Sequence, residues 1–449
     1  MPEGGGDGSS PLTPIPPQQP LGEPDPKMDK SSLHFTAFNY INSIVGSGVI
    51  GMPFALEQAG FGVGLVLLVV VACVTDVSLV LMIKAARISE MNTYQDLVAS
   101  SFGRIGFYIC SALQFMYPFI SLVSYNIIVG DTLTKVLVRV TGMSTINVLA
   151  RREFVMAATT LLITLPLSLY RNISRLAKIS LVSVVMITVI AVAMLVRLPT
   201  MKDLVPPTDD AWRFVGSNLA SAIGVMSFAF MCHHSSFLVF DSLVDNTQER
   251  WNKVTHISIG GAAILSLVFA VGGYAAFTGF VQGDIFENYC WADDLMNVCR
   301  GLYTVTILLT FPIECFVARD VLETAFFRSY GPQPLLRHAV MTVVIAVLVM
   351  FFSLSTDCLG VVLELNGIMC AIPLAYILPP LCFIRLEEGP MFGPNKLVAW
   401  GVVAFGSTSF LVGLISLFSN WSTVSECSHG VQMAYCFQDV NGTDVQLLF

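Results

Sequence analysis

Long uncharged apolar segments recur along this chain, and they constrain its fold more than any other feature of the sequence. About 20 consecutive apolar residues are enough to cross a bilayer as a helix. Eleven such segments predict an all-α membrane protein with eleven transmembrane helices. We expect these spans at Phe35–Leu56, Gly62–Ile83, Ile105–Leu133, Phe154–Leu169, Leu176–Val196, Leu219–Phe240, Ile257–Phe280, Leu302–Val317, Ala339–Leu354, Leu359–Ile384 and Leu397–Phe418.

The composition excludes several classes of function. Only 12% of the residues are charged, about half the fraction found in soluble domains. The formal net charge of −8 argues against a nucleic-acid partner. Because the chain contains no nucleophile elbow, metal-ligand cluster or phosphate loop, we expect neither an enzyme nor a covalent cofactor.

The spans divide the chain into five regions. Eight of the 22 prolines lie in the first 26 residues, so we expect a disordered cytoplasmic N-terminal tail. The expected regions are this tail (1–32), a first five-helix repeat (33–197), a second five-helix repeat (198–385), an eleventh helix (386–420) and an extracellular or lumenal C-terminal tail (421–449).

Basic residues and cysteines predict which side each loop faces. With the N-terminus inside, 15 of the 23 basic residues lie in cytoplasmic segments and 8 on the other side, as the positive-inside rule requires. Four cysteines then lie outside, where disulfides form: Cys290, Cys299, Cys427 and Cys436. They allow three pairings, of which the local ones (Cys290–Cys299 and Cys427–Cys436) are the simplest. The sequon at Asn441 also lies outside and is a glycosylation candidate.

The first span has a composition that is unfavourable for a continuous helix. Three glycines and a proline lie within eight residues, from Gly46 to Pro53, beside the polar residues Asn42 and Ser47. Unwound backbone at membrane depth is tolerated where it lines a cavity or binds a ligand. Small residues also promote close packing of helices, but for this run we favour a binding site.

The sixth span places polar residues in its middle. His233, His234, Ser235 and Ser236 follow an apolar stretch, and such groups are costly in hydrocarbon unless they face protein, water or a ligand. The alternative is a turn at the membrane surface. We favour a second break, although this segment contains no proline.

Spans one and six begin two blocks of five spans each. The blocks, Phe35–Val196 and Arg213–Ile384, have similar lengths, and an odd number of spans in each makes their orientations opposite. In inverted-repeat transporters the first helix of each repeat is interrupted, and the freed backbone groups bind substrate and coupling ion. A compact zwitterion with a carboxylate, such as an amino acid, suits such a site.

The chain resembles the amino acid/auxin permease group and, more closely, the sodium-coupled neutral amino acid transporters of the solute carrier 38 family. The resemblance covers residues 33–420 and depends on four motifs in spans one, six, eight and ten, which lie at Phe38–Pro53, Phe228–His234, Leu309–Phe316 and Gly360–Gly367. It implies a LeuT-like fold with a cytoplasmic N-terminus. It also implies cotransport of sodium with small neutral amino acids, coupled in some members to counter-movement of protons.

The family's sodium site implies three residues here. Its asparagine in span one and its threonine in span eight correspond to Asn42 and Thr310, with the carbonyl of Val45 as a further ligand. Thr306, one turn earlier, is the alternative hydroxyl. A threonine in a membrane helix can instead donate to its own i−4 carbonyl, and only the resemblance favours the sodium role.

The same motifs predict the substrate site. The amides of Gly46, Ser47 and Gly48, freed by the break, would meet the substrate carboxylate. An apolar lining argues for a neutral substrate, and we expect it from Phe228, Met231 and Cys232.

Titratable groups in the membrane have two interpretations. His233 and His234 are proton-coupling candidates, and a structural hydrogen bond is the alternative for each. Asp76, Glu314 and Glu364 are candidates for relay groups. For Glu314 and Glu364 we favour a structural or gating role.

Three functions follow from these features. The first is sodium symport of a neutral amino acid, with proton antiport as a further component. The second is a sodium-independent amino acid/proton exchanger, and the third is a receptor that senses amino acids without moving them. The expected partners are the amino acid, sodium and the lipid bilayer, with no obligate protein partner. We expect the plasma membrane, with the lysosomal membrane as the alternative, and a C-terminus outside.

Overall fold

The computed structural model describes residues 30–143, 147–170, 180–328, 333–419 and 431–437. The regular secondary structure within these residues is helical, without a β-strand among them. The α-helices (α) and the 3₁₀ or π segments (η) are α1 (Leu33–Ile44), η1 (Ser47–Gly51), α2 (Met52–Ala59), α3 (Phe61–Ser89), α4 (Tyr94–Thr141), η2 (Val148–Ala150), α5 (Arg152–Thr159), η3 (Thr160–Thr164), α6 (Leu165–Ser168), α8 (Ser180–Leu204), α9 (Leu219–Ala229), η4 (His233–Ser235), α10 (Ser236–Ser242), α11 (Gln248–Phe277), η5 (Thr278–Phe280), α12 (Ile285–Asn288), α13 (Asp294–Leu322), η6 (Glu323–Phe327), α14 (Leu335–Leu354), α15 (Leu359–Asn366), η8 (Gly367–Ala371), η9 (Pro373–Ile377), α16 (Leu378–Leu386), η10 (Pro394–Lys396), α17 (Leu397–Ser419) and η11 (Ala434–Phe437).

Nine helices in the described part of the chain are long and apolar enough to cross a membrane. They correspond to all the expected spans except the first and the fourth. The count of eleven therefore stays a prediction, and the expected start of span five at Leu176 lies outside the described residues. The fourth expected span is the helical stretch of α5, η3 and α6, from Arg152 to Ser168, which is shorter than the about 20 residues of a typical membrane span. Pro166, in the first turn of α6, has no N–H to continue an α-helical ladder, and a π segment precedes it.

Helix α4 is much longer than the third expected span, Ile105–Leu133. It covers 48 residues and contains one non-helical residue, Gly103, whose φ of 68° suits glycine. At its other end the helix continues until Gly142 adopts a left-handed conformation. The apolar segment thus covers only the middle of this helix, which extends beyond it at both ends.

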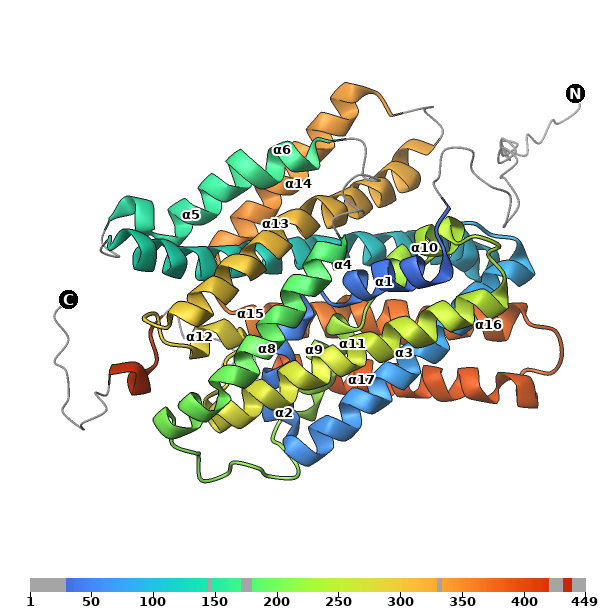
Figure 1. Ribbon diagram of the computed structural model, residues 1–449. Coiled ribbons are helices and arrows are strands. Elements are labelled where there is room, and N and C mark those ends of the chain that lie inside the picture. The colour runs from blue at the N-terminus through green and yellow to red at the C-terminus, as the bar shows by residue number, and fades with distance from the viewer. Residues whose placement is uncertain (1–29, 144–146, 171–179, 329–332, 420–430, 438–449) are drawn as a thin grey trace, which may run out of the picture.

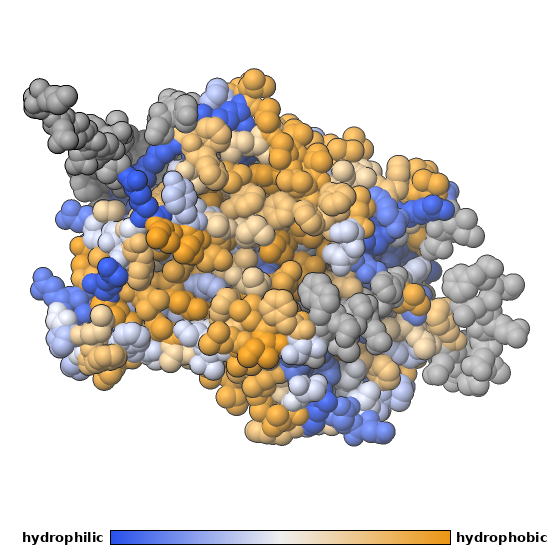
Figure 2. Space-filling view, turned by 180° about the vertical axis from the view of Figure 1, so that it is seen from behind, coloured by the Kyte–Doolittle hydropathy of each residue, from blue (hydrophilic) through white to orange (hydrophobic). Residues whose placement is uncertain are grey.

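The surface of the bundle is that of a membrane protein. Apolar side chains such as those of Ile105, Leu162, Leu336 and Phe418 are about three-quarters exposed. Hydrophobic residues cover the middle of the face in Figure 2, and hydrophilic residues gather toward its two ends. Such a surface is stable in lipid, whereas a soluble protein would bury these side chains.

Two interrupted helices lie in the interior of the bundle (Figure 1). The first is formed by α1, η1 and α2, and the second by α9, η4 and α10. Helix α1 packs against α8 and α11, and α2 packs against α3, α9 and α11. Helix α9 also packs against α15, η8 and α17. The surrounding long helices thus shield both interruptions from lipid.

Candidate functional site

The first interruption lies where the glycine-rich run predicts it. Helix α1 ends at Ile44, and the next residue, Val45, has φ −83° and ψ 71°. Gly46 has φ −103° and ψ −138°, and the 3₁₀ segment that follows leads into α2 at Met52. Proline in the first turn of α2 and glycines before it explain the break, because neither favours a continuous helix.

The second interruption is also present, although its sequence contains no proline. Helix α9 ends at Ala229, and Cys232 has φ −141° and ψ 5°. A 3₁₀ turn containing both histidines then leads into α10 at Ser236. His233 and His234 are both buried, which favours this break over a turn exposed at the membrane surface.

The two interruptions meet at Gly48. A Cβ atom added to Gly48 would lie 2.5 Å from the Cα and 2.6 Å from the Cβ of Ala229. Only glycine permits this approach, because real carbon–carbon contacts are near 3.5–4.0 Å. The backbone of the first break therefore packs directly on the last residue of α9.

Tyrosines from other helices bond the carbonyl groups of the second break. The hydroxyl of Tyr117 donates to the carbonyl oxygens of Phe228 and Met231, at 3.2 and 3.4 Å. The hydroxyl of Tyr40 lies 2.6 Å from that of Ser236 and 3.4 Å from the carbonyl oxygen of Cys232, to which Ser236 also donates at 3.0 Å. Buried carbonyls without a partner are costly, so these hydroxyls stabilise the interruption. No local sequence pattern points to either tyrosine, because their partners lie more than 100 residues away.

Gly46 differs from its expected role. Its N–H donates to the carbonyl oxygen of Ile44 at 2.9 Å, and its own carbonyl accepts from the hydroxyl of Tyr303 at 3.1 Å. The expectation that the break frees this amide for a ligand is therefore wrong. The physical reason is a tight local turn, which satisfies the N–H before a ligand can.

The two adjacent histidines have different surroundings. Ser78 donates its hydroxyl hydrogen to the carbonyl of Ala375, so the Nε2 of His233, 3.2 Å away, must donate to Ser78. In contrast, the Nε2 of His234 lies 3.5 Å from a carboxylate oxygen of Glu314. His233 thus has the structural hydrogen bond, and His234 faces an acid.

The expected sodium ligands lie on α1, α13 and the first break. Asn42 is buried on α1, and Val45 follows the end of that helix. The hydroxyl of Thr310 donates to the carbonyl of Thr306 at 2.8 Å, and the hydroxyl of Thr306 donates to that of Leu302 at 3.1 Å. Each hydroxyl donates its hydrogen and keeps its lone pairs, which a cation can still use. These hydrogen bonds therefore neither support nor contradict a sodium ligand here, and the sodium role stays a prediction.

The residues expected around the substrate side chain are tightly packed. Phe228, Met231 and Cys232 are all buried, and the ring of Phe228 lies 5.7 Å from that of Tyr117. A cavity of about 730 Å³ exists elsewhere, near the end of α4. The apolar lining is thus present, but these three residues do not line the cavity.

Two of the other membrane carboxylates have clear partners. The hydroxyl of Ser221 donates to Glu364 at 2.6 Å, and Asp76 lies 2.6 Å from a ring nitrogen of His256. Both contacts join different helices, which agrees with the structural role favoured for Glu364.

The disulfide pairing differs from the simplest expectation. Cys290 is bonded to Cys436, 146 residues later, and Cys299 is a buried free thiol. The local bonds Cys290–Cys299 and Cys427–Cys436 are therefore both wrong. The hydroxyl of Tyr435 in η11 donates to the carbonyl of Asn288 at the end of α12, and this contact brings Cys436 close to Cys290. Cys358 is also disulfide-bonded, which no sequence pattern indicated. Cys427 and Asn441 lie outside the described residues.

Comparison with known proteins decides the family. The family model described as transmembrane amino acid transporter protein matches residues 29–422. The chain belongs to this family. The resemblance to the sodium-coupled neutral amino acid transporters is thereby confirmed, and these relatives are transporters, not enzymes.

Individual members of this family match the chain over most of its length. A protein of Danio rerio named "Putative sodium-coupled neutral amino acid transporter 11" is 47% identical, over 91% of each chain. The Homo sapiens protein of the same name is 45% identical over 86% of this chain and 93% of its own. "Vacuolar amino acid transporter 2" of Saccharomyces cerevisiae is 29% identical over 91% of this chain and 86% of its own.

Solved structures share the fold. A crystal structure of the manganese transporter of Eremococcus coleocola superposes with a TM-score of 0.56 and covers 92% of this chain and 94% of its own. At 14% identity this likeness concerns the architecture alone.

Proposed function

We propose that this chain is a secondary active transporter that moves small neutral amino acids together with sodium. The observation that supports this most is the contact between two interrupted helices at Gly48 and Ala229, deep within a bundle of apolar helices. Interrupted helices at membrane depth are the usual binding elements of inverted-repeat transporters. The names of relatives such as the Danio rerio protein agree with this substrate and ion.

The proposed architecture is a LeuT-like 5+5 inverted repeat with an eleventh helix. Its support is that each expected repeat begins with an interrupted helix, α1–α2 in one and α9–α10 in the other. The fold shared with a solved transporter agrees with it. The disulfide between Cys290 and Cys436 favours an extracellular or lumenal location for that end of the bundle, because disulfides persist in oxidising compartments.

The proposed substrate site lies at the two breaks. Ser47 and Gly48 remain the candidates for binding the carboxylate, whereas the N–H of Gly46 is already bonded. Around the substrate side chain, the proposed lining of Phe228, Met231 and Cys232 is apolar and favours a neutral amino acid. A charged substrate side chain would lack a counter-charge at these three positions.

The proposed sodium site consists of Asn42, the carbonyl of Val45 and the hydroxyl of Thr310. Amide, carbonyl and hydroxyl oxygens are hard ligands that suit this cation. The hydrogen bond from Thr310 to the carbonyl of Thr306 occupies the hydroxyl hydrogen, so the lone pairs are available to a cation.

A second candidate is a sodium-independent amino acid/proton exchanger. The observation that favours it is the buried pair of His234 and Glu314, 3.5 Å apart. A histidine beside a carboxylate can take up and release a proton. In this candidate His234, and not the hydrogen-bonded His233, is the proton carrier.

Uptake by reconstituted protein tests these candidates. Thr310→Ala should abolish the stimulation by sodium, and Asn42→Ala should do the same, with normal amounts of folded protein. Thr188→Ala is the matched control, because the hydroxyl of Thr188 also donates to its i−4 carbonyl at 2.8 Å. Sodium stimulation that survives in Thr310→Ala and Asn42→Ala contradicts the proposed sodium site.

Varying the two gradients separately distinguishes the functions. Uptake that follows the pH gradient and persists without sodium supports the exchanger, and its loss in His234→Gln assigns the proton to that residue. Binding of an amino acid without counterflow of labelled substrate in proteoliposomes supports a sensor and contradicts both transport functions.

A further inference from the structure

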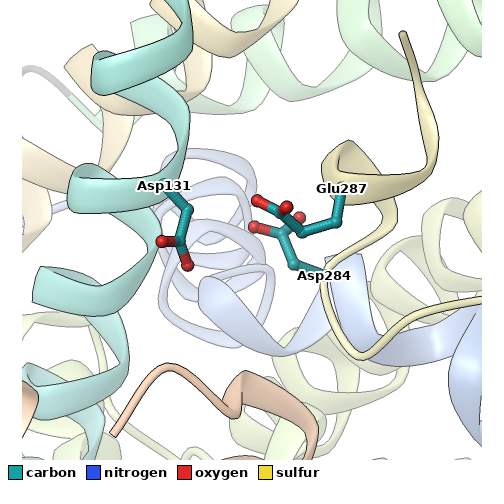
Figure 3. Close-up of side chains that lie close together, drawn as sticks. All are labelled: Asp131, Asp284 and Glu287. Carbon is teal, nitrogen blue, oxygen red and sulfur yellow. The ribbon is translucent and has the colours of Figure 1, made fainter. Parts of the chain in front are cut away.

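Three carboxylates converge at a distance from the two breaks. Asp131 lies on α4, Asp284 precedes α12, and Glu287 lies within α12 (Figure 3). All three side chains are more than nine-tenths buried, and oxygen atoms from each lie within 4.8 Å of one another. Asp284 and Glu287 point toward each other and face Asp131 across the gap between the elements. We call these three residues the carboxylate cluster.

The hydrogen bonds of the cluster are incomplete. Lys135 forms an ion pair with one oxygen of Glu287, and Arg152 forms one with Asp131. One oxygen of Asp284 accepts from the N–H of Phe286 at 2.8 Å. The remaining oxygens, Oδ2 of Asp284 and Oε2 of Glu287, are buried and have no hydrogen-bond partner. Two acceptors without a donor, side by side, are costly for a buried site.

The charged groups around the cluster do not supply the missing donor. Arg300 on α13 is fully buried, but its terminal nitrogens donate to the carbonyls of Phe286 and Tyr289 and to Asn297. The other charged or titratable groups nearby are Lys135 on α4, Arg151 before α5, Arg152 and Glu153 in α5, Asp293 and Tyr303 at α13, and Asp357 before α15. Lys135 and the Nε of Arg152 bond the other carboxylate oxygens. The Nη2 of Arg152 and the Nε of Arg300 are buried donors that bond neither Asp284 nor Glu287, because both lack a hydrogen-bond partner.

We propose that Asp131, Asp284 and Glu287 together hold one exchangeable proton, through which the pH of the solution at this end of the bundle acts on transport. A proton on the Oδ2 of Asp284 makes this oxygen a donor to the Oε2 of Glu287. Both oxygens then have a hydrogen-bond partner. A metal ion fits less well, because the ammonium of Lys135 and the guanidinium of Arg152 already contact the cluster. The link to transport rests on the proposed function.

Access and affinity both suit an exchangeable proton. The cavity of about 730 Å³ is lined by Asp131, Glu287 and Lys135, so water can reach the cluster. Burial, and then the neighbouring carboxylate of Glu287, raise the pKa of Asp284 to about 7. The proton therefore leaves within the physiological range of pH.

The cluster is connected to the first break by direct contacts. Phe286 lies between Asp284 and Glu287 in the chain, and its ring lies 5.4 Å from the ring of Tyr303. The hydroxyl of Tyr303 donates to the carbonyl of Gly46. A change in charge at the cluster that moves α12 is therefore transmitted to the break by two side chains.

Asp284→Asn tests the proposal, because its neutral amide imitates the protonated acid and can donate to Glu287. A carboxyl whose pKa is raised by folding stabilises the protein below its ordinary pKa and loses this contribution as pH rises through 7. From about pH 5 to about pH 8, the melting temperature of wild type should fall relative to Asp284→Asn by about 2 °C or more. Uptake by the variant should stay at the level that wild type shows at low pH. Asp209→Asn, at an exposed carboxylate, is the control and should behave as wild type.

Several results would overturn the proposal. Parallel pH profiles of wild type and Asp284→Asn, in melting temperature and in uptake, would show that the cluster holds no proton. A melting temperature that responds to calcium or magnesium at constant pH, and not to pH, would make the cluster a metal site instead. If Asp284→Asn does not fold, Glu287→Gln provides the same comparison at the other partnerless oxygen. If no amino acid is transported, the proposed function fails, and the melting temperatures still decide the proton site.

Discussion

Gly48→Ala should force the two interrupted helices apart at the point where they meet. The added Cβ would lie 2.5 Å from the Cα of Ala229, and an ordinary carbon–carbon contact is about 3.5 Å or longer. The two breaks must therefore separate by about 1 Å. Backbone atoms are in the way, so a change of rotamer cannot relieve the clash.

The expected cost follows from that overlap. Inserting a methyl group into a packed interior costs about 1–3 kcal/mol, which corresponds to roughly a 5- to 150-fold change in an equilibrium. We expect uptake by Gly48→Ala to fall by about tenfold or more. The melting temperature should fall by about 2–4 °C for each kcal/mol that the strain removes from stability.

Glycines in open positions provide the control. A Cβ atom added to Gly301 on α13, or to Gly260 on α11, meets nothing within 4 Å, so Gly301→Ala and Gly260→Ala should transport normally. Adding Ala229→Gly to Gly48→Ala removes the 2.6 Å contact with the Cβ of residue 229 and leaves the 2.5 Å contact with its Cα. The double variant should therefore recover only part of the lost uptake. Wild-type uptake and melting temperature in Gly48→Ala would refute the reasoning.

Two further predictions concern one hydrogen bond and one disulfide bond. Tyr303→Phe leaves the buried carbonyl of Gly46 without its donor, which should cost about 1–3 kcal/mol and lower both uptake and melting temperature. Tyr108→Phe, at an exposed tyrosine, should change neither, and equal effects of the two variants would contradict the role of Tyr303. Cys436→Ser opens a long covalent loop and should destabilise the protein by about 2–5 kcal/mol, measured by thermal unfolding. An equally large loss in Cys73→Ser, at an exposed free thiol, would show that the bond itself is unimportant.

The sequence predicts the first interruption well and the second less securely. Glycine and proline between Gly46 and Pro53 disfavour a helix whatever surrounds them, and the structure shows the break there. The second break has no such residues. Its carbonyls are instead bonded by Tyr40 and Tyr117, which come from distant helices and leave no mark in the local sequence.

The ends of helices are likewise only partly predictable from the sequence. The apolar segment Ile105–Leu133 covers only part of α4, and the helix itself continues to Thr141. Hydropathy measures the match to lipid, whereas the length of a helix depends on its caps and on packing beyond the membrane.

By itself, the sequence determined that the chain is helical, lies in a membrane, belongs with amino acid transporters and is interrupted near Gly46. These properties depend on composition and on neighbouring residues. Only the tertiary structure decided that Cys290 pairs with Cys436, that His234 and not His233 faces Glu314, and that three carboxylates converge near the end of α4. Such contacts join residues far apart in the chain, and their partners are selected by how the helices pack.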